Sequence, residues 1–196
     1  MKQHDQEFVT VGTNKPRKNI KYVRQLIIPG IITAIFLSVV FGGFYNVGAT
    51  NKHSKPVEWV LRTTMENSVR KNAASIKVPD SIKFGDSLYY REFYGHYSAA
   101  CQPCHGAPGK NRAPWMVIYP ESPDLTDKVI VGNWSDAELY WIIKHGIKNT
   151  GMMALGPTHP DEAVWGVTAF VKKLPEMTPE EYQSIAAWFE KTKGKM

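Results

Sequence analysis

Cysteine is scarce in this chain, because its 196 residues include only two, Cys101 and Cys104. Both belong to one short motif, so none remains for a disulfide framework. The sequence also has no second C-x-x-C pair and no H-x-x-x-H pair, which argues against a zinc site of the usual kind. No β-α-β pattern surrounds the motif, which argues against a thioredoxin-like redox dithiol.

The motif reads Cys101-Gln102-Pro103-Cys104-His105. The spacing C-x-x-C-H is typical of c-type haem attachment, because each thiol can form a thioether with one haem vinyl group. The histidine that follows is then placed to bind the iron as its proximal ligand. The sequence therefore predicts one covalently attached haem c, held by Cys101 and Cys104, with His105 on the iron.

The chain has little surplus charge outside its N-terminal region. The first 45 residues contain six Lys or Arg and two Asp or Glu, which leaves 18 basic and 16 acidic residues for the rest. Nucleic-acid binding calls for a basic face on the folded domain. The sequence shows no such face, and we expect no nucleic-acid partner.

Charged side chains are absent from residues 26–45, an apolar run long enough to span a membrane. Basic residues precede it closely, which predicts a cytoplasmic N-terminus. We therefore expect a cytoplasmic basic tail over 1–25, a single transmembrane anchor in the inner (cytoplasmic) membrane over 26–45, and the remaining chain on the periplasmic side. The alternative is a cleaved signal peptide, but the apolar run exceeds the usual length of such a segment. Both alternatives export the same part of the chain.

The chain also lacks alternating strand patterns, so we expect an all-α fold. A linker and an amphipathic helix near 57–74 should occupy residues 46–80, with the helix packed on its own domain. A small helical domain should surround the haem over residues 81–196. Ser or Thr followed by acidic residues marks three helix starts. The predicted helices cover 135–145, 158–174 and 178–191.

A second iron ligand is expected on the loop between two of these helices. Met152 directly follows Gly151 and lies 47 residues beyond His105, enough chain to pass around a haem. A methionine ligand raises the reduction potential and fills the sixth position of the iron. Met153 is the alternative, although it could instead pack in the core. His159 is a reserve ligand.

Other side chains have expected supporting roles. Pro114 or Pro120 would shape the loop whose carbonyl accepts the remaining ring proton of His105. Arg112, Trp134 and Trp141 could reach the haem propionates, although a solvated Arg112 fits the sequence equally well. Trp165 and Phe170 are expected to pack in the haem pocket.

The segments CQPCHGAPG, GIKNTGMMALGPTHPDEAVWGVTAFVKKLP and TPEEY together resemble the membrane-anchored, monohaem class I c-type cytochromes of bacteria. The resemblance covers about residues 87–191. In that family the loop usually reads Gly-Met-Pro-Ala with the methionine as axial ligand, which implies this role for Met152. Met153 replaces the proline. The family fold implies that Gly95 and Tyr94 cross Trp188 and Phe189 near the haem.

The resemblance implies an electron carrier rather than an enzyme. The expected function is single-electron transfer between respiratory or dehydrogenase partners on the periplasmic side, either as a free tethered carrier or as a subunit of a larger oxidoreductase complex. The alternative is a haem sensor or peroxidase-like enzyme with an open or displaceable sixth iron position. Coordination of the iron distinguishes the two.

Overall fold

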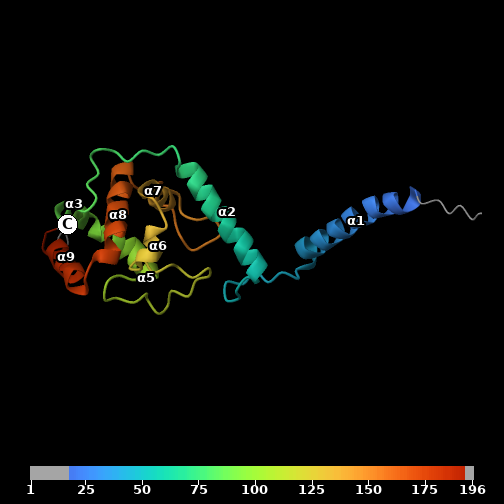
Figure 1. Cartoon of the computed structure of the whole chain (residues 1–196). Helices are drawn as coiled ribbons and strands as arrows, with labels where there is room; N and C mark the ends of the chain where they lie inside the picture. Colours follow the sequence, from blue (N-terminus) through green and yellow to red (C-terminus); the bar gives the residue numbers. More distant parts are fainter. Residues whose placement is uncertain (1–17, 193–196) are drawn as a thin grey trace, which may run out of the picture. The chain divides into compact units, whose positions relative to one another are not determined.

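The structure is a computed structural model that describes residues 18–192. The chain divides into two compact units, with Val47 ending the first and Gly48 beginning the second (Figure 1). Residues 1–17, which include most of the expected cytoplasmic tail, lie outside the described residues.

In the first unit the described chain forms a long helix, α1 (Lys18–Gly42). This helix begins within the segment expected to be tail, because extending an existing helix costs little for each added residue. Its stretch Arg24–Gly42 is apolar and long enough to cross a membrane, and none of that stretch is buried within the chain. Pro29 lies inside the helix, as is tolerated in membrane-spanning helices. Such a helix is consistent with membrane anchoring.

The second unit is helical, and no strand occurs among residues 48–192. An irregular but continuous helical run leads from Ser87 to His105. Its successive parts are α3 (Ser87–Tyr90), η1 (Arg91–Phe93), α4 (Tyr94–His96), the π-helical turn η2 (Tyr97–Cys101) and α5 (Gln102–His105). The other elements are α2 (Lys55–Ala73), α6 (Lys128–Gly132), α7 (Asp136–His145), α8 (Asp161–Lys173), η3 (Leu174–Glu176) and α9 (Pro179–Thr192). The expected all-α class is confirmed.

Two of the three predicted helix starts have the expected caps. Ser135 accepts from the Glu138 backbone N–H while Glu138 accepts from the Ser135 N–H, a complete capping box at α7. At α9 the Thr178 hydroxyl accepts from the Glu181 N–H at 3.1 Å. The cap predicted at Thr158 is wrong, because α8 begins at Asp161. The Thr158 hydroxyl instead donates to the Leu155 carbonyl.

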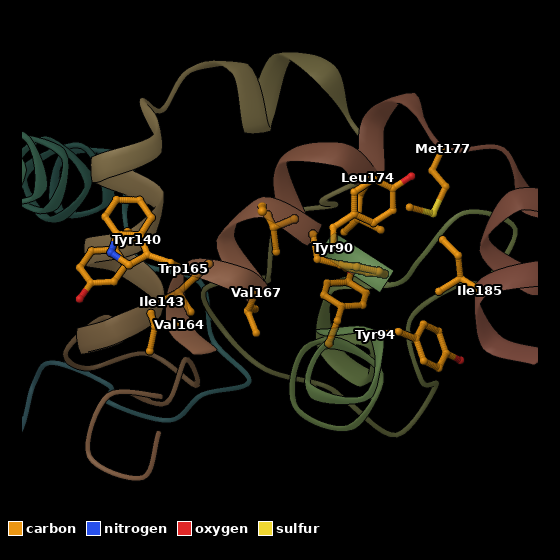
Figure 2. Close-up of a cluster of buried hydrophobic side chains, with 14 of the residues drawn as sticks. Tyr90, Tyr94, Tyr140, Ile143, Val164, Trp165, Val167, Leu174, Met177 and Ile185 are labelled. Atoms are coloured by element: carbon orange, nitrogen blue, oxygen red, sulfur yellow. The ribbon is translucent and has the colours of Figure 1, made fainter. Parts of the chain in front are cut away.

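Helix α8 is the centre of the core. It packs against α7 on one side and against the helical run 87–105 on another (Figure 1). Figure 2 shows buried side chains along its length, with Trp165 stacked on Tyr140 at one end. Phe170 is fully buried among tyrosines of the helical run and of α9. This apolar face explains why α8 is helical, since its burial is the main driving force for folding here.

Two glycines allow helices to approach closely. At Gly95 an added Cβ would lie 2.3 Å from Cζ of Phe189, so only glycine fits where α4 crosses α9. The Tyr94 ring also packs on Phe189, with centroids 5.5 Å apart. At Gly166 an added Cβ would lie 2.2 Å from the Phe93 ring. The crossing expected at Gly95 is therefore present.

The second half of helix α2 packs on its own domain, as the sequence predicts. Val69 and Ala73 are buried and the helix contacts α7. The guanidinium of Arg70 lies 6.0 Å from the Trp134 ring centroid, at the outer limit of a cation–π contact. Trp59, near the start of the helix, remains 68% exposed.

Candidate haem site

The motif residues lie on the last turns of the helical run 87–105. Cys101 ends the π-helical turn and Cys104 lies on α5; both are partly buried and neither forms a disulfide. Burial, with a smaller contribution from Cys104, raises the pKa of the Cys101 thiol to about 12. A redox dithiol needs a lowered pKa to attack as a thiolate. The environment of Cys101 therefore opposes a thioredoxin-like role.

His105 is buried, and its ring is oriented by one hydrogen bond. Nδ1 lies 2.8 Å from the carbonyl oxygen of Pro123 and donates to it. This leaves Nε2 as the atom free to bind a metal. Burial lowers the pKa of His105, partly opposed by that hydrogen bond. The imidazole is thus held neutral, which is the form that coordinates iron.

The acceptor for His105 is the carbonyl of Pro123, which lies on the same loop as Pro114 and Pro120. The sequence predicted an acceptor on this loop but did not single out Pro123. The reason lies in tethers that a sequence pattern does not reveal. The Ser122 hydroxyl donates to the Cys104 carbonyl at 2.6 Å, which places the next residue against the histidine ring.

The loop that carries Met152 packs against the C-terminus of α7. Gly146 there has φ +64°, and an added Cβ would lie 2.6 Å from the Met152 carbonyl oxygen. The Ile147 N–H donates to that oxygen at 3.3 Å. The Thr150 hydroxyl accepts from the Met152 N–H and donates to the Ile147 carbonyl. The backbone at Met152 is therefore fixed by several hydrogen bonds.

The two methionines have different environments. Met152 is partly buried and packs against the hydrophobic core. Met153 is 67% exposed, so the expectation that it could pack in the core does not hold. The environment of the pair thus favours Met152 as the candidate ligand.

The other expected residues fall into three groups. Arg112 contacts Glu121 at 2.7 Å and the Ser122 carbonyl at 3.1 Å, and it lines a cavity of about 430 Å³ that includes His105. Trp165 and Phe170 are buried in the core. The remaining three lie in ring contacts or hydrogen bonds of their own: Trp134 with Arg70 and Lys172, Trp141 with His145, and His159 with His96 and Thr158.

The donor set fits a haem. Two unpaired thiols stand at the attachment spacing, beside a neutral imidazole with one nitrogen free. A thioether, the ligand type that raises haem potentials, lies on a loop fixed by its own hydrogen bonds. Sequence reasoning missed the roles of Pro123, Ser122 and Gly146. The one available signal was Pro123 itself, a further proline after Pro120 in the run E-S-P-D.

Comparison with known proteins finds one related family. The family described as cytochrome c oxidase, cbb3-type, subunit III matches residues 90–171, which include the C-x-x-C-H motif and the Met152 loop. No curated protein and no solved structure matches the chain. The match supports a c-type cytochrome domain over these residues, a kind of domain that binds haem with its iron and transfers electrons.

Proposed function

We propose that the protein is a membrane-tethered, monohaem c-type cytochrome that transfers single electrons between redox partners. Cys101 and Cys104 would hold the haem covalently, and His105 and Met152 would bind its iron. The bound haem supplies one-electron exchange between the ferric and ferrous states of iron. The observation that carries the proposal is the neutral, oriented imidazole of His105 on the attachment motif.

The role of the polypeptide is to define the coordination of the iron. The Pro123 carbonyl fixes which nitrogen of His105 is available. The hydrogen bonds of Thr150 and Ile147 fix the backbone at Met152. If His105 and Met152 both bind the iron, small molecules would be kept from it. This supports an electron carrier over the alternative of a sensor or peroxidase-like enzyme, which would require Met152 to leave the iron.

Support for the location comes from α1 and from the basic residues around its start. We propose that α1 is a retained single-pass anchor in the inner membrane, with the haem domain on the periplasmic side. Partners would then be respiratory complexes or exported dehydrogenases, or the chain would be a subunit of such a complex. Resistance of the protein to alkaline extraction from membranes, together with its digestion by protease added to spheroplasts, tests this placement. Release as a soluble periplasmic protein would refute the anchor.

Visible spectra test the ligands directly. The full-length protein is purified in detergent, and its oxidised and reduced spectra are recorded with and without carbon monoxide. Met152→Ala should remove the methionine–iron charge-transfer band and allow carbon monoxide to bind. Met153→Ala is the matched control and should leave both unchanged, because that side chain is exposed. Binding of carbon monoxide by the unmutated protein would instead favour the sensor or enzyme alternative.

A further inference from the structure

The segment 112–123, here called the strap, is tied closely to the haem-attachment motif. At its start the Ala113 N–H donates to the Pro103 carbonyl at 3.0 Å. At its end the Ser122 hydroxyl donates to the Cys104 carbonyl, and the Pro123 carbonyl accepts from His105. Three consecutive residues of the motif therefore each contact the strap.

Arg112 closes the strap into a loop. Its guanidinium donates to the carbonyl of Ser122 at 3.1 Å and to the carboxylate of Glu121 at 2.7 Å. The two ends of the strap are thereby held together beside the motif. Unlike Arg112 and Glu121, Ser122 carries no charge, and its hydroxyl bonds only to the backbone of α5. Its replacement therefore removes a hydrogen bond without changing the charge beside the motif.

The middle of the strap contacts the Met152 loop. Ile118 lies against Gly151, where an added Cβ would be 3.2 Å from Cδ1 of Ile118. Gly151 directly precedes Met152. One segment of 12 residues thus contacts both the helix that carries His105 and the loop that carries Met152.

We propose that Ser122 and Ile118 are positioning residues through which the strap sets both axial ligands of the iron. Ser122 places the Pro123 carbonyl on the imidazole N–H, and Ile118 supports the Met152 loop through Gly151. The inference rests on the proposed ligands His105 and Met152. To these ligands the inference adds the strap, which tunes the electron donation of His105 and restrains the position of Met152.

The two residues should have different electronic effects. A carbonyl that accepts from the imidazole N–H makes the ring a stronger electron donor, which favours ferric iron. Loss of that bond should therefore raise the reduction potential without removing the methionine. Loss of the Ile118 side chain should loosen the methionine loop and leave the histidine bond intact.

The first experiment compares Ser122→Ala with Ser98→Ala in the full-length, haem-loaded protein. Ser98 is a matched control, since it is another half-buried serine whose hydroxyl donates to a backbone carbonyl, that of Gly95. We expect Ser122→Ala to raise the potential and to shift the His105 ring N–H resonance in NMR spectra of the reduced protein. Ser122→Thr, which keeps the hydroxyl, should restore both. Equal potentials in Ser122→Ala and Ser98→Ala would overturn the role of Ser122.

The second experiment compares Ile118→Ala with Val117→Ala. Val117 is the neighbouring strap residue and is 78% exposed. We expect Ile118→Ala to weaken the methionine–iron band and to let part of the reduced protein bind carbon monoxide, with no such change in Val117→Ala. Identical spectra of the two variants would overturn the role of Ile118. Haem content per chain, measured for every variant, separates misfolding from altered ligation.

Failure of the ligand assignment would look different. If the unmutated protein lacks the methionine–iron band, or Met152→Ala leaves it in place, Met152 is not the ligand and the role of Ile118 is refuted with it. The comparison of Ser122→Ala with Ser98→Ala depends only on His105 as a ligand, so it still tests whether Ser122 positions the Pro123 carbonyl.

Discussion

Gly95→Ala tests the close crossing of α4 and α9. The new methyl group would lie 2.3, 2.9 and 3.0 Å from three atoms of the Phe189 ring. Ordinary contacts between carbon atoms are about 3.5–4.0 Å. The ring must therefore move by about 1 Å or more, and the Tyr94 ring packed on it must adjust as well.

The size of the effect follows from two opposed contributions. Overpacking of this kind costs about 1–3 kcal/mol. Replacing glycine by alanine within a helix contributes up to about 1 kcal/mol of stabilisation. The expected net loss is thus about 1 kcal/mol. Gly132→Ala provides the matched control, because Gly132 lies on α6 and an added Cβ would meet nothing within 4 Å.

The assay is guanidinium unfolding of the full-length, haem-loaded protein in detergent, followed by tryptophan fluorescence and by circular dichroism. Coincident transitions with the two probes would justify a two-state treatment. Gly95→Ala should be less stable than Gly132→Ala by about 1–3 kcal/mol, because the helix-propensity contribution largely cancels. Phe189→Leu introduced together with Gly95→Ala should recover part of the loss. Equal stabilities of the two alanine variants would refute the close crossing.

Three further changes have definite expected results. Ser135→Ala should lower the free energy of unfolding by about 1 kcal/mol, measured by the same denaturation, because the capping box of α7 is lost. Gly146→Ala should weaken the methionine–iron band, read in the oxidised visible spectrum, since its Cβ would strike the Met152 carbonyl oxygen. Hydrogen bonding to Lys144, 2.6 Å away, lowers the pKa of Asp161. The ion pair between Asp161 and Lys144 therefore contributes to the free energy of unfolding above about pH 4, and this contribution is lost as the pH falls through the pKa of Asp161 in the folded state. Asp161→Asn should reduce stability by less than about 1 kcal/mol at pH 7 and by a smaller amount at pH 3, in unfolding curves at the two pH values, since the carboxylate is largely exposed.

Much of the fold was predictable because its signals are local. Ser135 and Glu138 lie three residues apart, and the capping box they form depends on little beyond that helix turn. The cap predicted at Thr158 failed for the converse reason. Its hydroxyl had a competing acceptor at the Leu155 carbonyl, and the helix could begin after Pro160 without it. A local sequence pattern predicts a helix cap reliably only where no neighbouring backbone group competes for a hydrogen bond with the capping side chain.

The Met152 loop was located from sequence, but its support was not. Gly146 precedes Met152 by six residues, and it was recognisable as a helix stop because glycine tolerates positive φ. The absence of a Cβ at Gly146 also makes room for the backbone of Met152. This second role depends on how the chain folds back onto α7, which the sequence does not reveal. The exposure difference that separates Met152 from Met153 also required the packed structure.

Orientation of the imidazole proposed to bind the iron could not be predicted in full from the sequence. A partner for the second ring nitrogen of His105 was required on chemical grounds, and prolines in the following loop were the natural candidates. Choosing among them depends on which residue is adjacent to a serine that can reach the Cys104 carbonyl. Such a tether joins residues 18 apart in the chain and leaves no periodic or compositional pattern. The motif thus predicts the kind of ligand, whereas the residues that orient it could be found only from the packing of the loop against the helix.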